Sequence, residues 1–355
     1  MKTDFIIIGG GVTGLSAAIR LSEAGADVIL LEAGDYPSHK VCGEFLSPEA
    51  LPLLDKWEIA PAAKVTTLKL ILPKRQWSAA LPQAAATMPR YCLDDALAQH
   101  AKKNSVQIKT CAKVERIDIP KSEGQHFNVF LTTGEQYTSS TLLVSTGRLM
   151  NSLTGQKMPK FRYIGAKAHF EGIAMSDELA MHLIPGAYFG MAPIGANRVN
   201  IAGLITCSQE EARHPRATLS AFLERHRASS FVKTLERGHC LFNDWMVGPV
   251  PEFGIRRQHL WPNTFFLGDA AGVIPPATGN GLAMGLTSGI LAADYALKGQ
   301  PQTYRKHWKA IYAPRISKGI LLHRLFLARR LPGAIPILCQ TFPFLYDYVF
   351  RATRG

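Results

Sequence analysis

The spacing of hydrophobic positions changes twice near the start of the chain. Residues 4–8 form a short apolar run, which predicts a buried parallel strand. From Gly11 onwards the apolar residues recur at helical spacing, and residues 27–32 form a second apolar run typical of another buried strand. The order of strand, helix and strand predicts one βαβ unit.

The middle of the chain follows a different pattern. Residues 65–81 alternate between polar and apolar positions, which predicts an antiparallel hairpin, and residues 161–206 predict further strands. A buried strand returns in "TFFLGDAAG", followed by a predicted helix over 281–297 and a helical tail from Tyr304. Parallel-sheet signals therefore lie at the two ends, which indicates a nucleotide domain assembled from separated segments with a second domain inserted between them.

Three glycines lie at the bend between the first strand and its helix. Gly9, Gly11 and Gly14 fit the pattern GxGxxG. Gly9 permits the tight turn, Gly11 lets a pyrophosphate approach the backbone, and Gly14 lets the helix pack close to the sheet. The alternative is a glycine-rich turn that holds no ligand, but a strand before it and a helix after it favour a dinucleotide site.

The residues that follow this bend support the same site. Val12 and Thr13 open the helix, whose free N–H groups and positive dipole end suit phosphates. Glu32 and Ala33 end the second strand, where a carboxylate accepts hydrogen bonds from a ribose 2′-OH. An acid at this place suits NAD or FAD, and this motif alone does not separate the two.

A second glycine-rich bend lies far down the chain. Gly268 and Asp269 follow a predicted strand, and Gly279, Gly281 and Leu282 open a predicted helix. An NAD dehydrogenase needs no second site of this kind, whereas the ribitol and ring of the longer FAD need contacts of their own. Asp269 would accept a hydrogen bond from the ribitol, and the helix N-terminus would stabilise negative charge on the reduced ring. The two bends together predict bound FAD.

The pair of motifs, GxGxxG and GDAAGxxxPxxGxG, resembles the para-hydroxybenzoate hydroxylase-like FAD-dependent oxidoreductase superfamily. Within it, "KVCGEFLSPEAL" and "IPPATGNGLAMGLTSG" look most like the geranylgeranyl reductase-like branch, and the closing "ATRG" looks like oxidoreductases associated with type III polyketide synthases. The resemblance implies an α/β fold. It consists of an FAD-binding Rossmann domain of glutathione reductase type, an inserted antiparallel-sheet substrate domain and a C-terminal helical tail.

The resemblance also assigns segments and one further residue. We place the FAD-binding domain at residues 1–60, 90–155 and 255–300, the substrate domain at 61–89 and 156–254, and the helical segment at 301–355. Arg90 matches the arginine that contacts the flavin nucleotide in this class.

Two places decide what the flavin does. Aromatic hydroxylases of the class carry an Asp-Gly motif where this chain has Thr146–Gly147. The missing Asp argues against assigning their NADPH mechanism directly to this chain. Cys42, in a loop that resembles the cysteine loop of geranylgeranyl reductases, is our candidate proton donor, with Lys40 and Glu44 as its charged neighbours. The alternative for Cys42 is a small residue that packs the loop.

These observations leave three functions open. The first is an NAD(P)H-using monooxygenase that hydroxylates or epoxidises an apolar aromatic or polyketide-type substrate, which the "ATRG" resemblance favours slightly. The second is a flavin-dependent reductase of isoprenoid double bonds, which Cys42 and the missing Asp favour. The third is a non-catalytic flavin-binding redox sensor or partner protein, and the complete flavin motifs oppose it.

Composition and charge narrow the partners and the location. The 355 residues are 47% hydrophobic and 19% charged, as in globular proteins, and the net charge of +13 favours anionic partners. The cations are dispersed, so we expect no nucleic-acid partner. The six cysteines lack zinc spacing, so we expect no metal and reduced thiols.

We also expect no signal peptide, no spanning helix and a cytoplasmic location. The basic, apolar tail either packs on the core or contacts the inner face of an anionic membrane.

Overall fold

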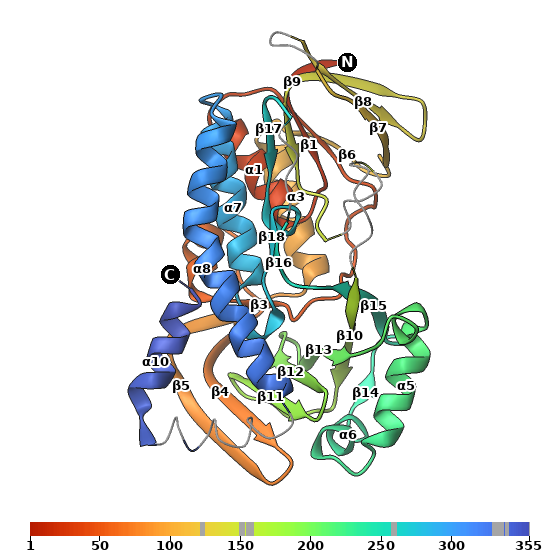
Figure 1. The fold of residues 1–355 in the computed structure, drawn as a ribbon, viewed down its shortest axis with the longest axis vertical. Helices are drawn as coiled ribbons and strands as arrows, with labels where there is room; N and C mark the ends of the chain where they lie inside the picture. The colour runs from red at the N-terminus through yellow and green to blue at the C-terminus, as the bar shows by residue number, and fades with distance from the viewer. Residues whose placement is uncertain are drawn as a thin grey trace.

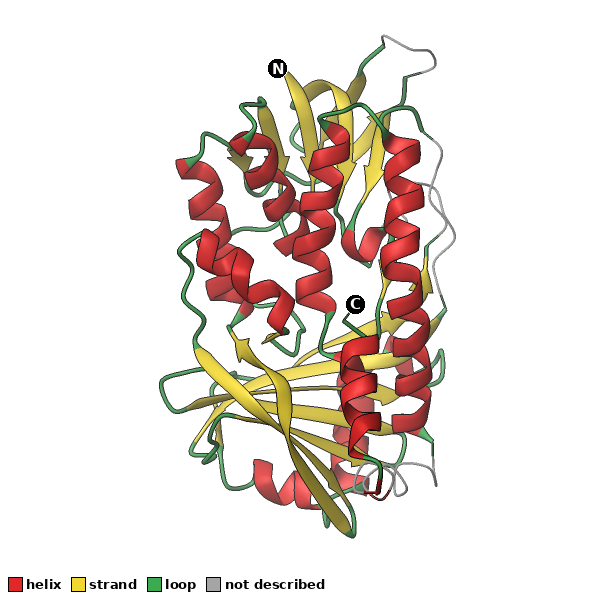
Figure 2. Cartoon of the chain, turned by 90° about the vertical axis from the view of Figure 1, so that its left-hand side faces the viewer, coloured by secondary structure: helices red, strands yellow, loops and turns green. Residues whose placement is uncertain are grey.

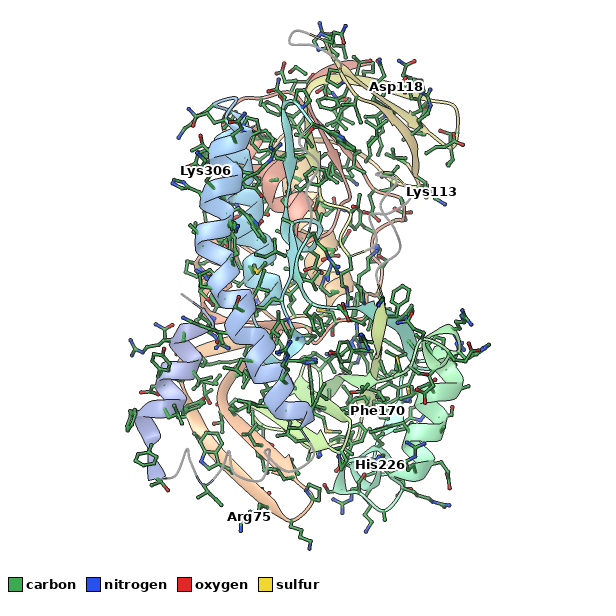
Figure 3. The ribbon with its side chains drawn as sticks, in the orientation of Figure 1. Arg75, Lys113, Asp118, Phe170, His226 and Lys306 are labelled. Carbon is green, nitrogen blue, oxygen red and sulfur yellow. The ribbon has the colours of Figure 1, made fainter. Side chains whose placement is uncertain are left out.

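The structure is a computed structural model that describes residues 1–120, 125–148, 153, 160–256, 261–328, 337 and 341–354. Two β-sheets lie towards opposite ends of an elongated molecule, and long helices run along one side (Figure 1). Asp118 and Arg75 mark the two ends (Figure 3).

The first sheet joins strands from both ends of the chain. Its order is β6-β2-β1-β9-β8-β7, and β17 also pairs with β9. The pairings of β1, β2, β6, β9 and β17 are parallel, whereas β7, β8 and β9 pair antiparallel. The strands are β1 (Lys2–Ile8), β2 (Val28–Leu31), β6 (Gln107–Lys109), β7 (Val114–Asp118), β8 (Phe127–Leu131), β9 (Gln136–Val144) and β17 (Thr264–Phe266).

Helices cover this sheet and share its core. They are α1 (Val12–Glu23), α3 (Arg90–Lys103), α7 (Gly281–Ala296) and α8 (Pro301–Leu327), with the short α2 (Leu51–Lys56) nearby. Helices α1 and α7 pack closely because Gly289 of α7 faces Ser16 and Thr13, where any Cβ would overlap them. The hydroxyl of Ser16 donates to the carbonyl of Leu286 at 3.0 Å, which ties the two helices together.

The second sheet is mostly antiparallel, in the order β14-β10-β13-β12-β11-β4-β5-β3, with β15 paired to β10. Only the β4–β11 pairing is parallel among those that the structure describes. The strands are β3 (Phe45–Leu46), β4 (Ala63–Leu72), β5 (Arg75–Thr87), β10 (Phe161–Glu171), β11 (Glu178–Ile184), β12 (Ala187–Pro193), β13 (Arg198–Thr206), β14 (His239–Cys240) and β15 (Met246–Pro251). Short strands β16 (Gly254–Ile255) and β18 (Gly272–Val273) pair with each other.

Helices lie on both faces of the second sheet (Figure 2). On one face α5 (Pro215–Arg225) and α6 (Ser230–Leu235) pack against apolar side chains of β10, β12 and β13. On the other face the end of α8 and α10 (Pro343–Ala352) share a separate apolar cluster with β4, β5, β11 and β12. This second face borders the cavity described below.

Helix α8 connects the two sheets. Near its start the Tyr304 hydroxyl donates to the carbonyl of Phe266 in β17 at 2.8 Å. Near its end Phe326 packs on Tyr188 of β12, with 6.0 Å between ring centroids. The predicted helical segment 301–355 therefore begins as part of the FAD-side core, and its residues 329–336, 338–340 and 355 lie outside the described residues. Within the described residues, no helix combines the length and apolar composition needed to cross a membrane.

The α/β fold class is confirmed, with differences at element ends. The predicted hairpin at 65–81 is β4–β5, which begins at Ala63 and continues to Thr87. Strand β3, within the predicted FAD segment 1–60, pairs with β5 of the second sheet. Its Phe45 packs with Val65 and Ala85 of that sheet, whereas Leu46 belongs to the core of the first sheet. The domain boundaries themselves stay predictions.

Candidate active site

The first glycine bend requires glycine at two places. Gly9 has a positive φ of 100°, and a Cβ there would overlap the carbonyl oxygen of Ser145. A Cβ at Gly14 would overlap the carbonyl oxygen of Gly9, so the first turn of α1 lies against the end of β1. The bend therefore brings the start of α1 close to the sheet.

Gly11 has a different environment. It is the N-cap of α1, and the nearest atom to a Cβ placed there is Nη2 of Arg90 at 3.8 Å. Gly11, Val12 and Thr13 line a cavity, so the free N–H groups at this helix end are open to a ligand. Such an arrangement of backbone donors fits a pyrophosphate.

Glu32 and Ala33 do not line this cavity. The two carboxylate oxygens of Glu32 accept hydrogen bonds from the backbone N–H groups of Gly10 at 2.6 Å and Gly34 at 3.0 Å. Each oxygen keeps a lone pair for a ribose hydroxyl. Ala33 is exposed, and Lys40 Nζ lies 4.0 Å from the Glu32 carboxylate.

The second glycine bend reaches the same cavity. Asp269, Gly279, Gly281 and Leu282 line it, and Gly268 lies just behind, where its N–H donates to Ser288 at 3.0 Å. Gly279 has a positive φ of 64°, which directs the chain into α7. The N-termini of α1 and α7 thus open into one cavity from segments that are far apart in the sequence.

The Asp269 carboxylate lies between the cavity and two arginines. Limited access to solvent raises the pKa of Asp269, while Arg148, whose Nε lies 3.7 Å away, and Arg256 act in the opposite direction. The buried hydroxyl of Thr146 lines the same end of the cavity and has no hydrogen-bond partner among the described residues. This unpartnered hydroxyl fits a polar ligand at this end.

These features match the needs of FAD. The N–H groups of Gly11–Thr13 would hold the pyrophosphate, Asp269 would hold the ribitol, and the N-terminus of α7 would face the ring. Arg90 lies beside Gly11, and its guanidinium forms two hydrogen bonds of 2.7 Å with Asp94, which fix its position. Within the described residues, no cluster of side chains is suited to a metal ion.

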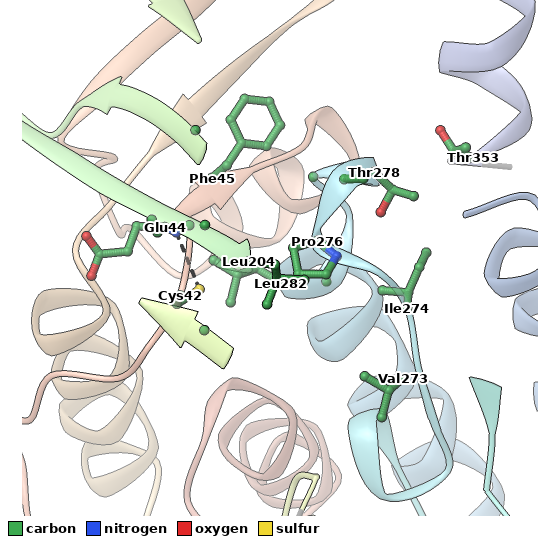
Figure 4. Close-up of a pocket in the computed structure, with 18 of the residues that line it drawn as sticks. Cys42, Glu44, Phe45, Leu204, Val273, Ile274, Pro276, Thr278, Leu282 and Thr353 are labelled. Atoms are coloured by element: carbon green, nitrogen blue, oxygen red, sulfur yellow. Dashed lines mark hydrogen bonds between the residues drawn. The ribbon is translucent and has the colours of Figure 1, made fainter. Parts of the chain in front are cut away.

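Cys42 lies in the wall of the cavity (Figure 4). Its Sγ accepts a hydrogen bond from the N–H of Glu44 at 3.3 Å, and its thiol also interacts with the Arg90 guanidinium. The buried amide of Asn200, on β13, donates to the carbonyl of Cys42 at 3.2 Å. The loop that carries the thiol is therefore held by the second sheet and by α3.

Glu44 is an anchor within this loop. It has a positive φ of 56° and no solvent exposure, and its carboxylate points away from Cys42 (Figure 4). The carboxylate accepts hydrogen bonds from Lys167 at 2.5 Å, from His169 at 2.8 Å and from the backbone of Arg90 at 2.8 Å. Burial alone would raise the pKa of Glu44, but His169 and Lys167 outweigh it and hold the pKa below its usual value.

Sequence reasoning did not single out Lys167, and it judged His169 more often structural than catalytic because it lies in a predicted strand. They lie two residues apart on β10, on the face opposite the apolar positions Ala166 and Ala168. A lysine inside a buried run of small and apolar residues was the available signal, because such a charge requires a partner. The partner of Lys167 could not be predicted from the sequence, because Glu44 is more than a hundred residues away.

The remaining candidate, Lys40, lines the rim of the cavity and keeps 41% of its side chain exposed. The structure therefore gathers eight of the predicted cofactor residues at the cavity wall, and leaves Gly9, Gly14, Glu32, Ala33 and Gly268 outside its lining. The eight are Gly11, Val12, Thr13, Arg90, Asp269, Gly279, Gly281 and Leu282, and the catalytic candidate Cys42 lies in the loop beside them.

Comparisons with known proteins find a matching family model and relatives of this chain. The family model of FAD-dependent oxidoreductases matches residues 4–49. A menaquinone reductase of Mycolicibacterium smegmatis is 25% identical over 371 residues, covering 95% of this chain and 87% of that protein. Digeranylgeranylglycerophospholipid reductase 1 of Methanothermobacter thermautotrophicus is 26% identical over 320 residues, covering 83% of this chain and 77% of that protein.

The fold is shared with solved structures. That of a flavin-dependent brominase superposes with a TM-score of 0.80 at 15% identity, over 99% of this chain and 93% of its own. Together with the family match at the first glycine bend, these similarities confirm the resemblance inferred from the two motifs. The chain is accordingly an FAD-dependent oxidoreductase, similar at its first glycine bend to the family of that name and over most of its length to the two reductases.

Proposed function

We propose that this enzyme reduces a carbon–carbon double bond in an apolar, isoprenoid-like substrate. The observation that carries the proposal is the shape and chemistry of the cavity. It has a volume of about 920 Å³, and it continues from the two glycine bends into an apolar region between the second sheet and helices α8 and α10. This volume is at the upper end of about 300–1,000 Å³, the usual range for ligand pockets.

Small residues on the sheet make room for the substrate. Gly165, Gly190 and Gly203 line the cavity floor, together with three alanines of β10, β12 and β13. Apolar side chains close the opposite side, including Leu325 of α8 and Val349 of α10. Such walls bind a long hydrocarbon by removing its surface from water.

The residues at the nucleotide end bind and orient the cofactor. When bound there and reduced, FAD would supply the hydride for one carbon of the double bond. Gly11–Thr13 and Arg90 would hold its phosphates, and Asp269 would hold its ribitol. We propose that NAD(P)H is the electron donor that reduces the flavin, and that it binds without a Rossmann domain of its own.

Cys42 supplies the proton to the neighbouring carbon. The S–H bond breaks as the new C–H bond forms, and a thiolate remains on Sγ. The N–H of Glu44, at 3.3 Å, and the Arg90 guanidinium stabilise that thiolate until water returns a proton. The product therefore gains two hydrogens, one as hydride and one as proton.

The names of the relatives support reduction. The two relatives described above are both called reductases, and the name of one refers to geranylgeranyl groups. The test is the mass of the product formed from geranylgeraniol, with and without oxygen. A gain of two hydrogens without oxygen supports the proposal, and a gain of one oxygen atom that requires O2 contradicts it.

A second candidate is the monooxygenase favoured slightly by the sequence. Trp77, Phe253 and Tyr346 line the apolar region, and such rings stack well on an aromatic or polyketide-type substrate. Oxygen-dependent NAD(P)H consumption with hydroxylation or epoxidation of that substrate would identify this activity.

A further inference from the structure

One hydroxyl lies within the apolar region of the cavity. Tyr188, on β12, lines the cavity and is only 2% exposed. Leu70, Met181 and Leu204 belong to the same apolar cluster. A hydroxyl in such surroundings costs free energy unless its hydrogen-bonding capacity is used.

His323 of α8 holds this hydroxyl. The Tyr188 Oη lies 3.2 Å from Nδ1 of His323, and the backbone of Ala277 also forms a hydrogen bond with it. Ala277 belongs to the loop that leads into α7, so Tyr188 lies between the apolar region and the nucleotide end. Burial raises the pKa of Tyr188, which keeps the phenol protonated.

Aromatic rings enclose His323. Its ring centroid lies 4.9 Å from that of Tyr163 and 4.9 Å from that of Phe253. Burial lowers the pKa of His323 to about 4, so the imidazole is neutral at pH 7. Its Nε2 is buried and has no hydrogen-bond partner among the described residues.

The missing partner of Nε2 indicates the tautomer. A buried N–H without an acceptor is rarer than an acceptor without a donor. The hydrogen is therefore placed on Nδ1, from which it is donated to Tyr188 Oη. Because Nδ1–H of His323 donates to Tyr188 Oη, the Tyr188 hydrogen remains for a group in the cavity.

We propose that Tyr188, oriented by His323, donates a hydrogen bond to one oxygen of the substrate. This inference rests on the proposed function and narrows its substrate class. The substrate is an apolar molecule that carries a carbonyl, quinone or hydroxyl oxygen at one end of its unsaturated hydrocarbon chain. A pure hydrocarbon leaves the Tyr188 hydrogen without an acceptor and binds more weakly.

The test measures binding of two probes to the FAD-loaded protein by isothermal titration calorimetry. One probe is geranylacetone, and the other is the hydrocarbon in which a CH2 group replaces its carbonyl oxygen. Wild type is expected to prefer the ketone by about tenfold, the size of one hydrogen bond. Tyr188→Phe is expected to bind both probes equally.

Two further variants separate this role from a structural one. Tyr163→Phe removes a hydroxyl from the other ring beside His323, outside the cavity lining, and should keep the preference. His323→Leu removes the group that orients Tyr188 and should reduce the preference while hydrocarbon binding stays unchanged.

The outcomes distinguish this inference from the proposed function. If both probes bind to wild type and Tyr188→Phe keeps the preference, the role of Tyr188 is wrong while the apolar site stands. If neither probe binds to wild type, both proposals are wrong.

Discussion

Cys42 is the residue on which the proposed proton transfer depends. Cys42→Ala should lower alkene reduction by about a hundredfold, because general acids contribute at least that factor. The FAD content should stay unchanged, because the groups proposed to hold FAD are the N–H groups of Gly11–Thr13, Arg90 and Asp269, and Arg90 stays fixed by Asp94. Single-turnover rates and the flavin-to-protein ratio measure the two effects.

Cys240 offers a matched control for this substitution. It is half-buried on β14 and does not line the cavity, so Cys240→Ala should keep the wild-type rate. A Cys42→Ala variant that also keeps the wild-type rate would remove the thiol from the mechanism.

Glu44 stabilises the folded protein through its charge. Glu44→Gln leaves Lys167 buried without a counter-charge, and this should cost about 3–5 kcal/mol in the free energy of unfolding. Glu210→Gln is the control, because Glu210 pairs with Arg213 at the surface and should cost less than about 1 kcal/mol. Urea denaturation measures both values.

The lowered pKa of Glu44 adds a dependence on pH. Its stabilisation is present above the ordinary carboxyl pKa of 4.5, and it is lost as the pH falls through the lower value in the folded state. Wild type should therefore lose its stability advantage over Glu44→Gln as the solution is acidified below 4.5. An advantage that is independent of pH would show that Glu44 is not ionised.

At the scale of elements, the contact between α1 and α7 aligns the two glycine bends. Gly289→Ala places a methyl group against Ser16 and Thr13, where no space exists. Overpacking of this kind costs about 1–3 kcal/mol, and the displaced α7 should also lower the FAD content. Chemical denaturation and flavin absorbance measure the two effects.

Gly248, on β15, is the control for this substitution. A Cβ there meets nothing within 4 Å, so Gly248→Ala should leave FAD content unchanged. Equal FAD content and stability in the two variants would contradict the role given to the helix contact.

The sequence predicted those elements whose signals are local. The helix expected over 281–297 is α7 (Gly281–Ala296), because its glycines, small residues and preceding prolines are all adjacent in the chain. The contact of Glu44 with Lys167 and His169 was not predictable, since it depends on how one sheet packs against the other. The same holds for Tyr188 and His323, whose partnership arises only where α8 reaches the second sheet.

At the scale of the whole molecule, α10 has apolar residues on two sides. Leu345 and Val349 line the cavity, whereas Phe344 and Tyr348 are 68% and 64% exposed on the outside. The net charge of the chain is +13, so this exposed side suits an anionic membrane. We therefore propose the second of the two alternatives for the tail, which is contact with a membrane surface.

The enzyme should therefore float with vesicles that contain phosphatidylglycerol. The double variant Phe344→Ser and Tyr348→Ser should float less, whereas Ile255→Ser, which changes an exposed residue on β16, should not. If the double variant and wild type float equally, α10 does not contact the membrane.

The most direct test of the proposed reduction is the reoxidation of the flavin by substrate in the absence of oxygen. The FAD-loaded protein is reduced anaerobically, geranylgeraniol is added, and the visible absorbance of oxidised flavin is followed. We predict that this absorbance returns with substrate alone, and that it returns more slowly in Cys42→Ala. A wild-type flavin that stays reduced until oxygen is admitted would contradict alkene reduction and favour the monooxygenase.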